Sequence, residues 1–291
     1  MRMELPRTDR GASHWDRATL ETRIADTRTR QRHPGGSPDR TEIAAYSAAL
    51  GREPLTASTA VVLGMTPELR VLALARGFRL ITVDSNPHAI SLYRDWIEPA
   101  DQKRETIIQA DWFSLATALA QPVDVVLADG VFGNLPDAAA HWRLLDTIAA
   151  FLSAGGRFAT RMALIPDGFK PADHCADRLL QRFRAREIDD AEFGFGMRLV
   201  GHHDPCYDPR TYLLDSAKMF AHCAARHAAG EITDAEHAII RRYYFGGTNC
   251  ILSQRAWESV LTGGGWRFRI HRSRGKAWYE YYPVYSCSRE A

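Results

Sequence analysis

The sequence lacks three features that would place the chain in a special class. No apolar run approaches the roughly 18 residues that a membrane-spanning helix requires, so we expect no membrane contact. The first residues contain no apolar stretch of the kind that a secretory signal peptide needs. The 5 cysteines form no Cys-x-x-Cys pair, and their number is odd. These absences favour a reduced, cytoplasmic protein without a disulfide framework.

The sequence also has few lysines and a net charge close to zero. Nearly all of the 37 basic side chains are arginine, a bias that we attribute to codon usage, and the net charge is +2. So small a charge gives no general attraction to nucleic acid, which is therefore not expected as a partner. The chain has enough hydrophobic residues to form a large core, since they make up 45% of its 291 residues. The length suits one large domain with insertions or two small ones, and nothing indicates an oligomeric state.

Between residues 57 and 165, strand-like apolar runs alternate with helix-like stretches. Such alternation, with uniformly apolar strands, is typical of a parallel sheet buried on both faces. The last predicted helix ends in the turn Ser153-Ala154-Gly155-Gly156, a good helix stop. Strands are predicted at 60–64, 79–83, 105–108, 123–128 and 157–164, and helices at 67–76, 87–96, 113–120 and 137–152.

Three segments flank this core, which spans 51–165. Residues 1–50 hold predicted helices at 16–30 and 41–51, the second closing at Gly51. The part before residue 41 forms either a flexible leader or a lid over the site, with Trp15, His33 and Arg40 as contacts. Residues 166–250 form an insertion that we expect to cover the substrate pocket, with helices at 171–187, 211–229 and 233–245. Residues 251–291 add a helix and two antiparallel strands, at 253–261, 266–271 and 277–287. The prediction is a doubly wound α/β fold with a mostly parallel seven-stranded sheet.

The most informative motif is the turn that ends the first predicted strand. The run Val61-Val62-Leu63 leads into Gly64-Met65-Thr66-Pro67-Glu68, and Asp84 ends the next strand 20 positions after the glycine. An acid at about this spacing can reach the ribose hydroxyls of a nucleoside that lies across the strand ends. The motif therefore predicts a nucleoside cofactor.

The order of these signals resembles that of class I S-adenosylmethionine-dependent methyltransferases over residues 57–165, and more loosely over 253–287. The resemblance implies a Rossmann-like fold with S-adenosylmethionine as cofactor. It also implies that Asp84 binds the ribose, that Asp111 and Trp112 contact the adenine, and that the end of the fourth strand lies under the methionine moiety. The cofactor-binding residues that it implies are Gly64, Met65, Thr66, Glu68, Asp84, Ser85, Asn86, Asp111, Trp112, Asp129 and Gly130.

The first loop departs from the family pattern, and this leaves other functions open. Thr66 and Glu68 stand where two further glycines are common, and Val62 replaces an acid. A non-catalytic scaffold that binds a partner or senses the cofactor would follow if this loop cannot accept the ligand. A nicotinamide-dependent oxidoreductase would need a G-x-G-x-x-G loop facing pyrophosphate, and Met65 and Glu68 argue against that.

Each of the selected side chains also has a structural alternative. Asp84 and Asp111 could cap the helices that follow them, and Trp112 could be ordinary core. Asp129 ends the fourth strand, where a buried carboxylate is costly unless a ligand or backbone donors meet it.

Methyl transfer from a sulfonium is an in-line displacement, in which the enzyme aligns the acceptor and excludes water. A general base is needed only for an acceptor that cannot lose its proton unaided. Arg161 either holds an anionic acceptor or forms a salt bridge with a neighbouring acid. No spacing of His and Cys matches a zinc pattern, so no metal is predicted. The large insertion favours a small-molecule acceptor, such as a specialised metabolite, methylated on oxygen or nitrogen. The candidate catalytic residues are His141, Arg161, His202, His203 and Tyr243.

Overall fold

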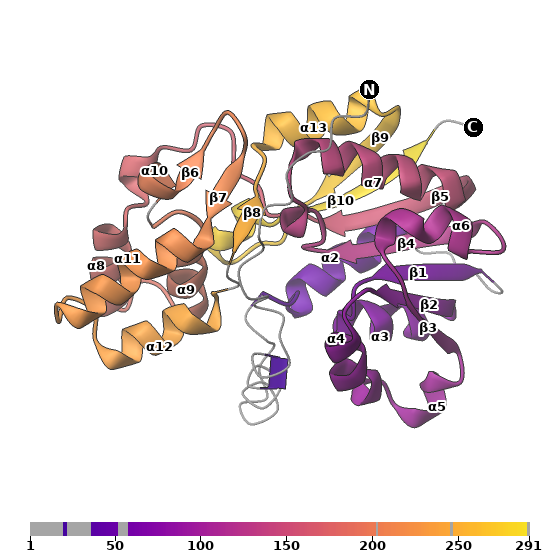
Figure 1. Cartoon of the computed structure of the whole chain (residues 1–291), viewed down its shortest axis with the longest axis horizontal. Helices are drawn as coiled ribbons and strands as arrows, with labels where there is room; N and C mark the ends of the chain where they lie inside the picture. The colour runs from indigo at the N-terminus through magenta and orange to yellow at the C-terminus, as the bar shows by residue number, and fades with distance from the viewer. Residues whose placement is uncertain (1–19, 22–35, 52–57, 202, 245–246, 290–291) are drawn as a thin grey trace, which may run out of the picture.

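The computed structural model describes residues 20–21, 36–51, 58–201, 203–244 and 247–289. Its centre is a seven-stranded sheet with the order β3-β2-β1-β4-β5-β10-β9 (Figure 1). Strands β1 to β5 pair in parallel, and β10 is antiparallel to both β5 and β9. The predicted doubly wound α/β fold is confirmed. The strands are β1 (Thr59–Leu63), β2 (Arg79–Asp84), β3 (Glu105–Gln109), β4 (Val123–Asp129), β5 (Leu152–Arg161), β9 (Trp266–His271) and β10 (Val284–Arg289).

Side chains of the central strands alternate between two buried faces. In β1, Val61 and Leu63 join the core on the side of α7 and α13, whereas Ala60 and Val62 join the core on the side of α2 and α3. Because both faces are covered, β1 is apolar from Ala60 to Leu63. Each fully buried Val or Leu contributes about 1.5–3 kcal/mol. The helices around the sheet are α2 (Arg40–Leu50), α3 (Pro67–Ala75), α4 (Pro87–Tyr93), α5 (Pro99–Gln102), α6 (Leu115–Ala118), α7 (Ala138–Phe151) and α13 (Gln254–Gly263), with short 3-10 turns η1 (Arg94–Trp96), η2 (Trp112–Ser114) and η3 (Phe132–Asn134).

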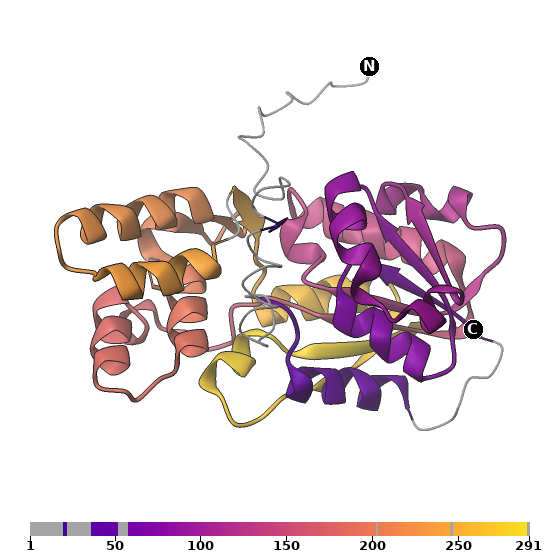
Figure 2. The same ribbon diagram turned by 90° about the horizontal axis from the view of Figure 1, so that it is seen from below.

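The chain between β5 and α13 forms a mainly helical unit that lies to one side of the sheet (Figures 1 and 2). The arrowheads of β4 and β5 point toward it in Figure 1. Its separate apolar core is completed by Trp278 and Tyr281 of η5 (Ala277–Tyr281). None of the helices in the described part of the chain is long and apolar enough to cross a membrane. The unit contains η4 (Pro171–Asp173), α8 (Ala176–Arg184), α9 (Asp190–Leu199), α10 (His203–Cys206), α11 (Ser216–Ala228), α12 (Asp234–Arg242), β6 (Tyr207–Asp208), β7 (Leu213–Asp215) and β8 (Thr248–Cys250).

Several predicted boundaries differ from the structure. The turn predicted at 153–156 lies within β5 as a bulge, because the pairing with β4 passes from Val123–Leu152 directly to Val125–Arg157 and leaves these four residues without a partner in β4. The helix predicted from 211 begins only at Ser216, because β7 forms first. Half of the strand predicted at 277–287 is the turn η5. The helix predicted at 16–30 lies outside the described residues except for Leu20 and Glu21, and the lid contacts Trp15 and His33 lie outside them altogether.

Helix α9 was not predicted, because Gly194 and Gly196 weaken the helical pattern of its sequence. Packing explains both glycines. A Cβ at Gly194 would stand 2.1 Å from the ring of Tyr243, and one at Gly196 would stand 2.8 Å from Leu179. The glycines therefore allow α9 to approach α8 and α12 closely, and this tertiary contact outweighs the local preference.

A buried ion pair ties α3 to β3 on the face of the sheet that α3 covers. Arg70 is fully buried and binds Glu105 through two contacts of 2.7 Å, Nε to Oε1 and Nη2 to Oε2. Its Nη1 donates to the carbonyl of Tyr93 at 2.6 Å, and Thr82 donates to Glu105 at 2.5 Å. Because every partner is fixed, loss of the cation would leave a buried carboxylate without compensation.

We predict that Arg70→Ala lowers the free energy of unfolding by about 3–5 kcal/mol, because Glu105 then stays buried and unpaired. Urea denaturation followed by circular dichroism measures this. Arg178→Ala is the matched control, since its ion pair with Asp173 is exposed and should contribute under about 1 kcal/mol. Equal losses in the two variants would contradict the prediction.

Candidate functional site

The loop after β1 leaves its backbone accessible at the carboxyl edge of the sheet. Gly64 has a φ of +87°, and apart from its chain neighbours no heavy atom of the described residues lies within 4 Å of the place where a Cβ would stand. Its N–H donates to the carbonyl of Val83 in β2 at 2.8 Å. Gly130, directly after β4, has a φ of +62° and is open in the same way. A side chain at either position would be strained, whereas a ligand can approach the backbone closely there.

Asp84 ends β2 beside this loop, and its carboxylate is half-buried. It accepts the backbone N–H of Asn86 at 2.8 Å and those of Met65 and Ser85. Burial raises the pKa of Asp84, and these backbone donors offset part of the rise. The N-cap of α4 is Asn86, whose side chain accepts from two backbone N–H groups, so Asp84 is not the cap. Asp84 instead braces the loop after β1 and remains at the edge of the sheet.

Asp111 and Trp112 lie next to Asp84, because β2 and β3 pair Asp84 with Gln109. Asp111 is exposed and caps η2, accepting the N–H of Phe113 at 3.0 Å. The indole N–H of Trp112 donates to the carbonyl of Val83 at 3.0 Å, which fixes the ring at the end of β2. The cap predicted as an alternative for Asp111 is therefore present, and its contact with an adenine remains a prediction.

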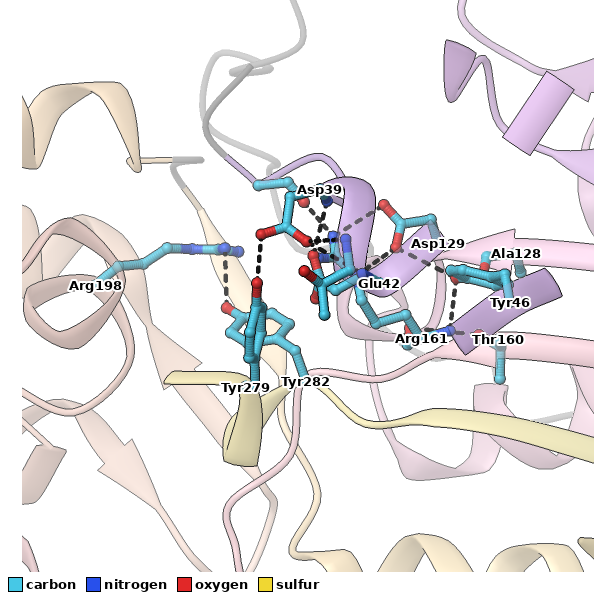
Figure 3. A network of polar contacts seen from close by, with 12 residues as sticks. Asp39, Glu42, Tyr46, Ala128, Asp129, Thr160, Arg161, Arg198, Tyr279 and Tyr282 are labelled. Atoms are coloured by element: carbon cyan, nitrogen blue, oxygen red, sulfur yellow. Dashed lines mark hydrogen bonds and ion pairs between the residues drawn. The ribbon is translucent and has the colours of Figure 1, made fainter. Parts of the chain in front are cut away.

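A buried polar network joins β4, β5 and α2 at the same edge (Figure 3). Arg161 is only 2% exposed, and it holds both carboxylate oxygens of Asp129, at 2.6 Å from Nε and 3.1 Å from Nη2. Its Nη1 donates to Glu42 at 2.7 Å, and Nη2 also donates to the carbonyl of Gly36. Each of the three guanidinium nitrogens thus donates to a partner within the protein. The structure favours the salt-bridge alternative for Arg161 over the role of holding an anionic acceptor.

Tyrosines extend this network in two directions. The hydroxyl of Tyr46 donates to the carbonyl of Ala128 at 2.6 Å and accepts the N–H of Arg161 at 2.8 Å, so it bridges β4 and β5. On the other side, the ring of Tyr282 lies over the Arg161 guanidinium at 5.3 Å, and its hydroxyl accepts from Arg198 of α9 at 3.4 Å (Figure 3). The network therefore connects the end of the sheet with the helical unit.

Burial changes the acids of this network. It raises the pKa of Asp129 and of Glu42, although the Arg161 cation acts against the rise in both. The charge of Glu68 raises the pKa of Asp129 further. Asp129 thus places a carboxylate at the end of β4, where it can attract a ligand that carries positive charge.

The remaining catalytic candidates do not gather at this edge. His141 is fully buried in α7 between Phe132 and Trp257, and burial lowers its pKa to about 4, so it is a neutral core residue and not a suitable base. His203 and Tyr243 lie in the helical unit, where their rings pack on Phe169 and Phe195, respectively. His202 lies outside the described residues.

Sequence reasoning missed Glu42 and Tyr46, although the signal was present. They lie four residues apart in α2 and continue into Ala49 and Leu50, so all four share one helix face. A glutamate within an otherwise apolar stripe predicts a buried cation partner. The partner, Arg161, is 119 residues away and could not be identified from this pattern.

The residues at this edge fit S-adenosylmethionine, the cofactor that the sequence resemblance implies. The open backbone at Gly64 admits a ligand close to the strand end, and the Asp84 carboxylate can accept hydrogen bonds from ribose hydroxyls. The carboxylate of Asp129 at the end of β4 can attract a cationic sulfonium.

The described residues give no sign of a second kind of site at this edge. Among them, no group of three or more His, Cys, Asp or Glu side chains lies close enough to hold a metal ion. All five cysteines are free thiols, and only Cys175 is exposed. The thiols therefore add no disulfide to the fold.

Comparison with known proteins identifies the fold. The sequence matches no protein-family model and no curated protein. Among solved structures, the methyltransferase CcbJ from Streptomyces caelestis is 15% identical, with a TM-score of 0.56 over 95% of this chain and 100% of that one. The glycopeptide N-methyltransferase MtfA, complexed with S-adenosyl-L-methionine, is 15% identical, with a TM-score of 0.52 over 86% of this chain and 94% of its own.

A third match carries a different description. A protein from Rhodobacter sphaeroides, provisionally described as a Zn-dependent alcohol dehydrogenase, is 17% identical, with a TM-score of 0.53 over 88% of this chain and 92% of that one. At such identities the likeness concerns the fold alone. The sheet order, with β10 inserted antiparallel between β5 and β9, is that of the class I methyltransferase fold. The resemblance of the sequence to class I methyltransferases is therefore confirmed for the fold.

We predict that Arg161→Met lowers the free energy of unfolding by about 3–5 kcal/mol near pH 8, because Glu42 and Asp129 stay buried without a cation. Both acids have raised pKa values in the folded state, which therefore binds more protons than the unfolded chain, and stability falls as the pH rises above about 4. Without Arg161 these pKa values rise further. The deficit should therefore shrink between about pH 8 and about pH 5.

Urea denaturation of both proteins at the two pH values tests this. Arg178→Met, which breaks an exposed pair, is the control and should show little deficit at either pH. A deficit in Arg161→Met that is independent of pH would mean that the two carboxylates do not carry the effect.

Proposed function

We propose that this protein is an S-adenosylmethionine-dependent methyltransferase that acts on an oxygen or nitrogen atom of a small molecule. One observation carries the proposal: the open backbone at Gly64 and the carboxylate of Asp84 stand side by side at the ends of β1 and β2. The fold supports it, since methyltransferases share it at low identity. The helical unit beside the sheet supports a small acceptor, because it can cover the reaction from solvent.

The proposed cofactor supplies a methyl group already activated by the positive charge of a sulfonium. The residues of this chain then bind and orient. Asp84 would accept from the ribose, and Trp112 would offer a fixed aromatic wall at the end of β2. Asp129, held in place by Arg161, would supply negative charge for the sulfonium. An acceptor that needs a general base must obtain it outside this network.

The same residues also bear on two other functions, an oxidoreductase and a non-catalytic scaffold. An oxidoreductase that binds a dinucleotide would place pyrophosphate near the loop after β1, where the carboxylates of Glu68 and Asp129 would repel it. A non-catalytic scaffold remains the main alternative. It would keep the ion network and the fold but bind no nucleoside.

We predict that the protein binds S-adenosylhomocysteine in the micromolar range and does not bind NAD, as measured by isothermal titration calorimetry. Asp84→Ala should weaken this binding at least several-fold, because the ribose acceptor is lost and the loop at Met65 loses its brace. Asp111→Ala is the matched variant and should weaken binding less, since its carboxylate is exposed and caps only η2.

Asp84→Asn separates the two roles of Asp84, because the amide keeps an acceptor for the loop and loses the charge. Unchanged affinity in both Asp84 variants would refute the ribose assignment. Absence of binding to either ligand by the parent protein would favour the scaffold, and NAD binding alone would favour the oxidoreductase.

We also propose that the N-terminal segment acts as a lid. The packing of Leu20 supports this, since its side chain is fully buried in a cluster with Met65 of the loop after β1 and with Ala89 and Tyr93 of α4. If the segment opens independently of the sheet, Leu20→Ala should change the global free energy of unfolding by less than about 1 kcal/mol and should speed hydrogen exchange around residue 20. Leu144→Ala, on the buried face of α7, should lower the free energy of unfolding by about 2–5 kcal/mol.

Urea denaturation and hydrogen exchange with mass spectrometry measure the two effects. Equal losses of stability in the two variants would show that Leu20 belongs to the cooperative core, and the lid proposal would fail. Added S-adenosylhomocysteine should slow exchange around residue 20 in the parent protein.

A further inference from the structure

One edge of the seven-stranded sheet is basic. β9 is the last strand in the sheet order, and among the described residues no further strand pairs with its outer side. Between Glu258 and Glu280 the chain contains four arginines and one lysine but no acidic residue. An edge strand presents backbone N–H and C=O groups with which another extended segment can pair. The edge at β9 is therefore a surface to which a strand can be added.

The two faces of β9 differ in character. Arg267 and Arg269 are both exposed, and they lie on the same face because side chains alternate along a strand. Phe268 and Ile270 lie on the other face, where they are half-buried against the apolar core that α13 covers. A strand added to this edge would therefore meet guanidinium groups on one face and the rims of apolar side chains on the other.

Nearby acids do not balance the charge of this edge. The side chain of Arg269 forms no ion pair with any of the described residues. Arg272, which directly follows the strand, is exposed and donates to the neutral amide oxygen of Gln254 at 2.9 Å. Arg274 is exposed as well. The edge thus keeps positive charge that the carboxylates of a partner can approach.

The two faces together select among the partners that a basic edge could attract. A second copy of the chain, paired through its own β9, would bring arginines of both copies together, and like charges destabilise a strand pair. A nucleic acid offers phosphates for the arginines but no strand backbone for β9. An extended peptide can pair with the backbone of β9, and side chains of alternating character would match both of its faces.

We propose that β9 is a docking edge for an extended protein segment in which acidic and apolar side chains alternate. The segment pairs with the backbone of β9, its carboxylates lie beside Arg267 and Arg269, and its apolar side chains cover Phe268 and Ile270. In the sheet order, β4, β5 and β10 separate this edge from β1. The docking edge is therefore distinct from the nucleoside site, and the proposal does not rest on methyl transfer.

Binding of the labelled peptide Val-Glu-Val-Glu-Val-Glu, followed by fluorescence anisotropy at low ionic strength, tests the docking edge. At about pH 8 its carboxylates are ionised, so copies of the peptide repel each other. The peptide Val-Val-Val-Glu-Glu-Glu has the same composition without the alternation and should bind more weakly. Hydrogen exchange with mass spectrometry locates the contact. The alternating peptide should slow exchange at 266–271 in β9 and leave 105–109 in β3, the opposite edge, unchanged.

Two charge reversals separate this edge from general attraction. Arg269→Glu should weaken binding of the alternating peptide about two- to thirtyfold, because a pair of opposite charges across two strands becomes a pair of like charges. Arg178→Glu reverses an exposed charge on α8 in the helical unit and should bind like the parent protein. The peptide Val-Lys-Val-Lys-Val-Lys should bind Arg269→Glu more tightly than it binds the parent, since the charges are then exchanged.

Four results would overturn the proposal. They are equal affinity of the parent for the two Val–Glu peptides, equal affinity of Arg269→Glu and the parent, tighter binding of a thymidine hexanucleotide than of the alternating peptide, and absence of binding at about 1 mM peptide. The last result is expected if the arginines of β9 only keep other strands away from the edge.

Discussion

The carboxyl edge of the sheet depends on one buried guanidinium. Arg161 gathers Asp129 from the end of β4 and Glu42 from α2, and its own backbone N–H is held by Tyr46. None of these charges could be buried alone, because desolvation of an unpaired ion costs several kcal/mol. The ion network therefore acts as a unit: it fixes the spacing of β4 and β5, orients α2 across the sheet and sets the charge at the strand ends.

The same network determines what the edge can bind. Arg161 holds both carboxylate oxygens of Asp129, so this charge stays at the end of β4 and can attract a cation. Beside it, Gly64 and Asp84 depend on each other, since the carboxylate of Asp84 accepts the N–H of Met65 directly after the glycine. The edge thus combines an accessible backbone, an acceptor for hydroxyl groups and a carboxylate that is held in place.

Much of the fold could be predicted from the sequence, because it follows from local patterns. Uniformly apolar runs separated by amphipathic helices specify a parallel sheet whatever the distant contacts are. Prediction was wrong where packing between distant segments overrides the local preference. Helix α9 forms in spite of Gly194 and Gly196. The two glycines leave space in which the ring of Tyr243 and the side chain of Leu179 pack directly against the helix. The turn expected at 153–156 is a bulge inside β5, because β4 pairs with the residues on both sides of it.

For the candidate site, the sequence by itself determined the loop at Gly64 and its distance to Asp84, because both lie on consecutive elements joined by a single helix. It left Arg161 between two roles and gave His141 the appearance of a base. Only the tertiary structure decided between the two roles of Arg161 and showed that His141 is a core residue. The partners of Arg161 lie 32 and 119 residues away, and the burial of His141 depends on Phe132 and Trp257. Chemistry that rests on neighbours in the chain can be read from the sequence, whereas a buried charge obtains its role from partners that only folding brings together.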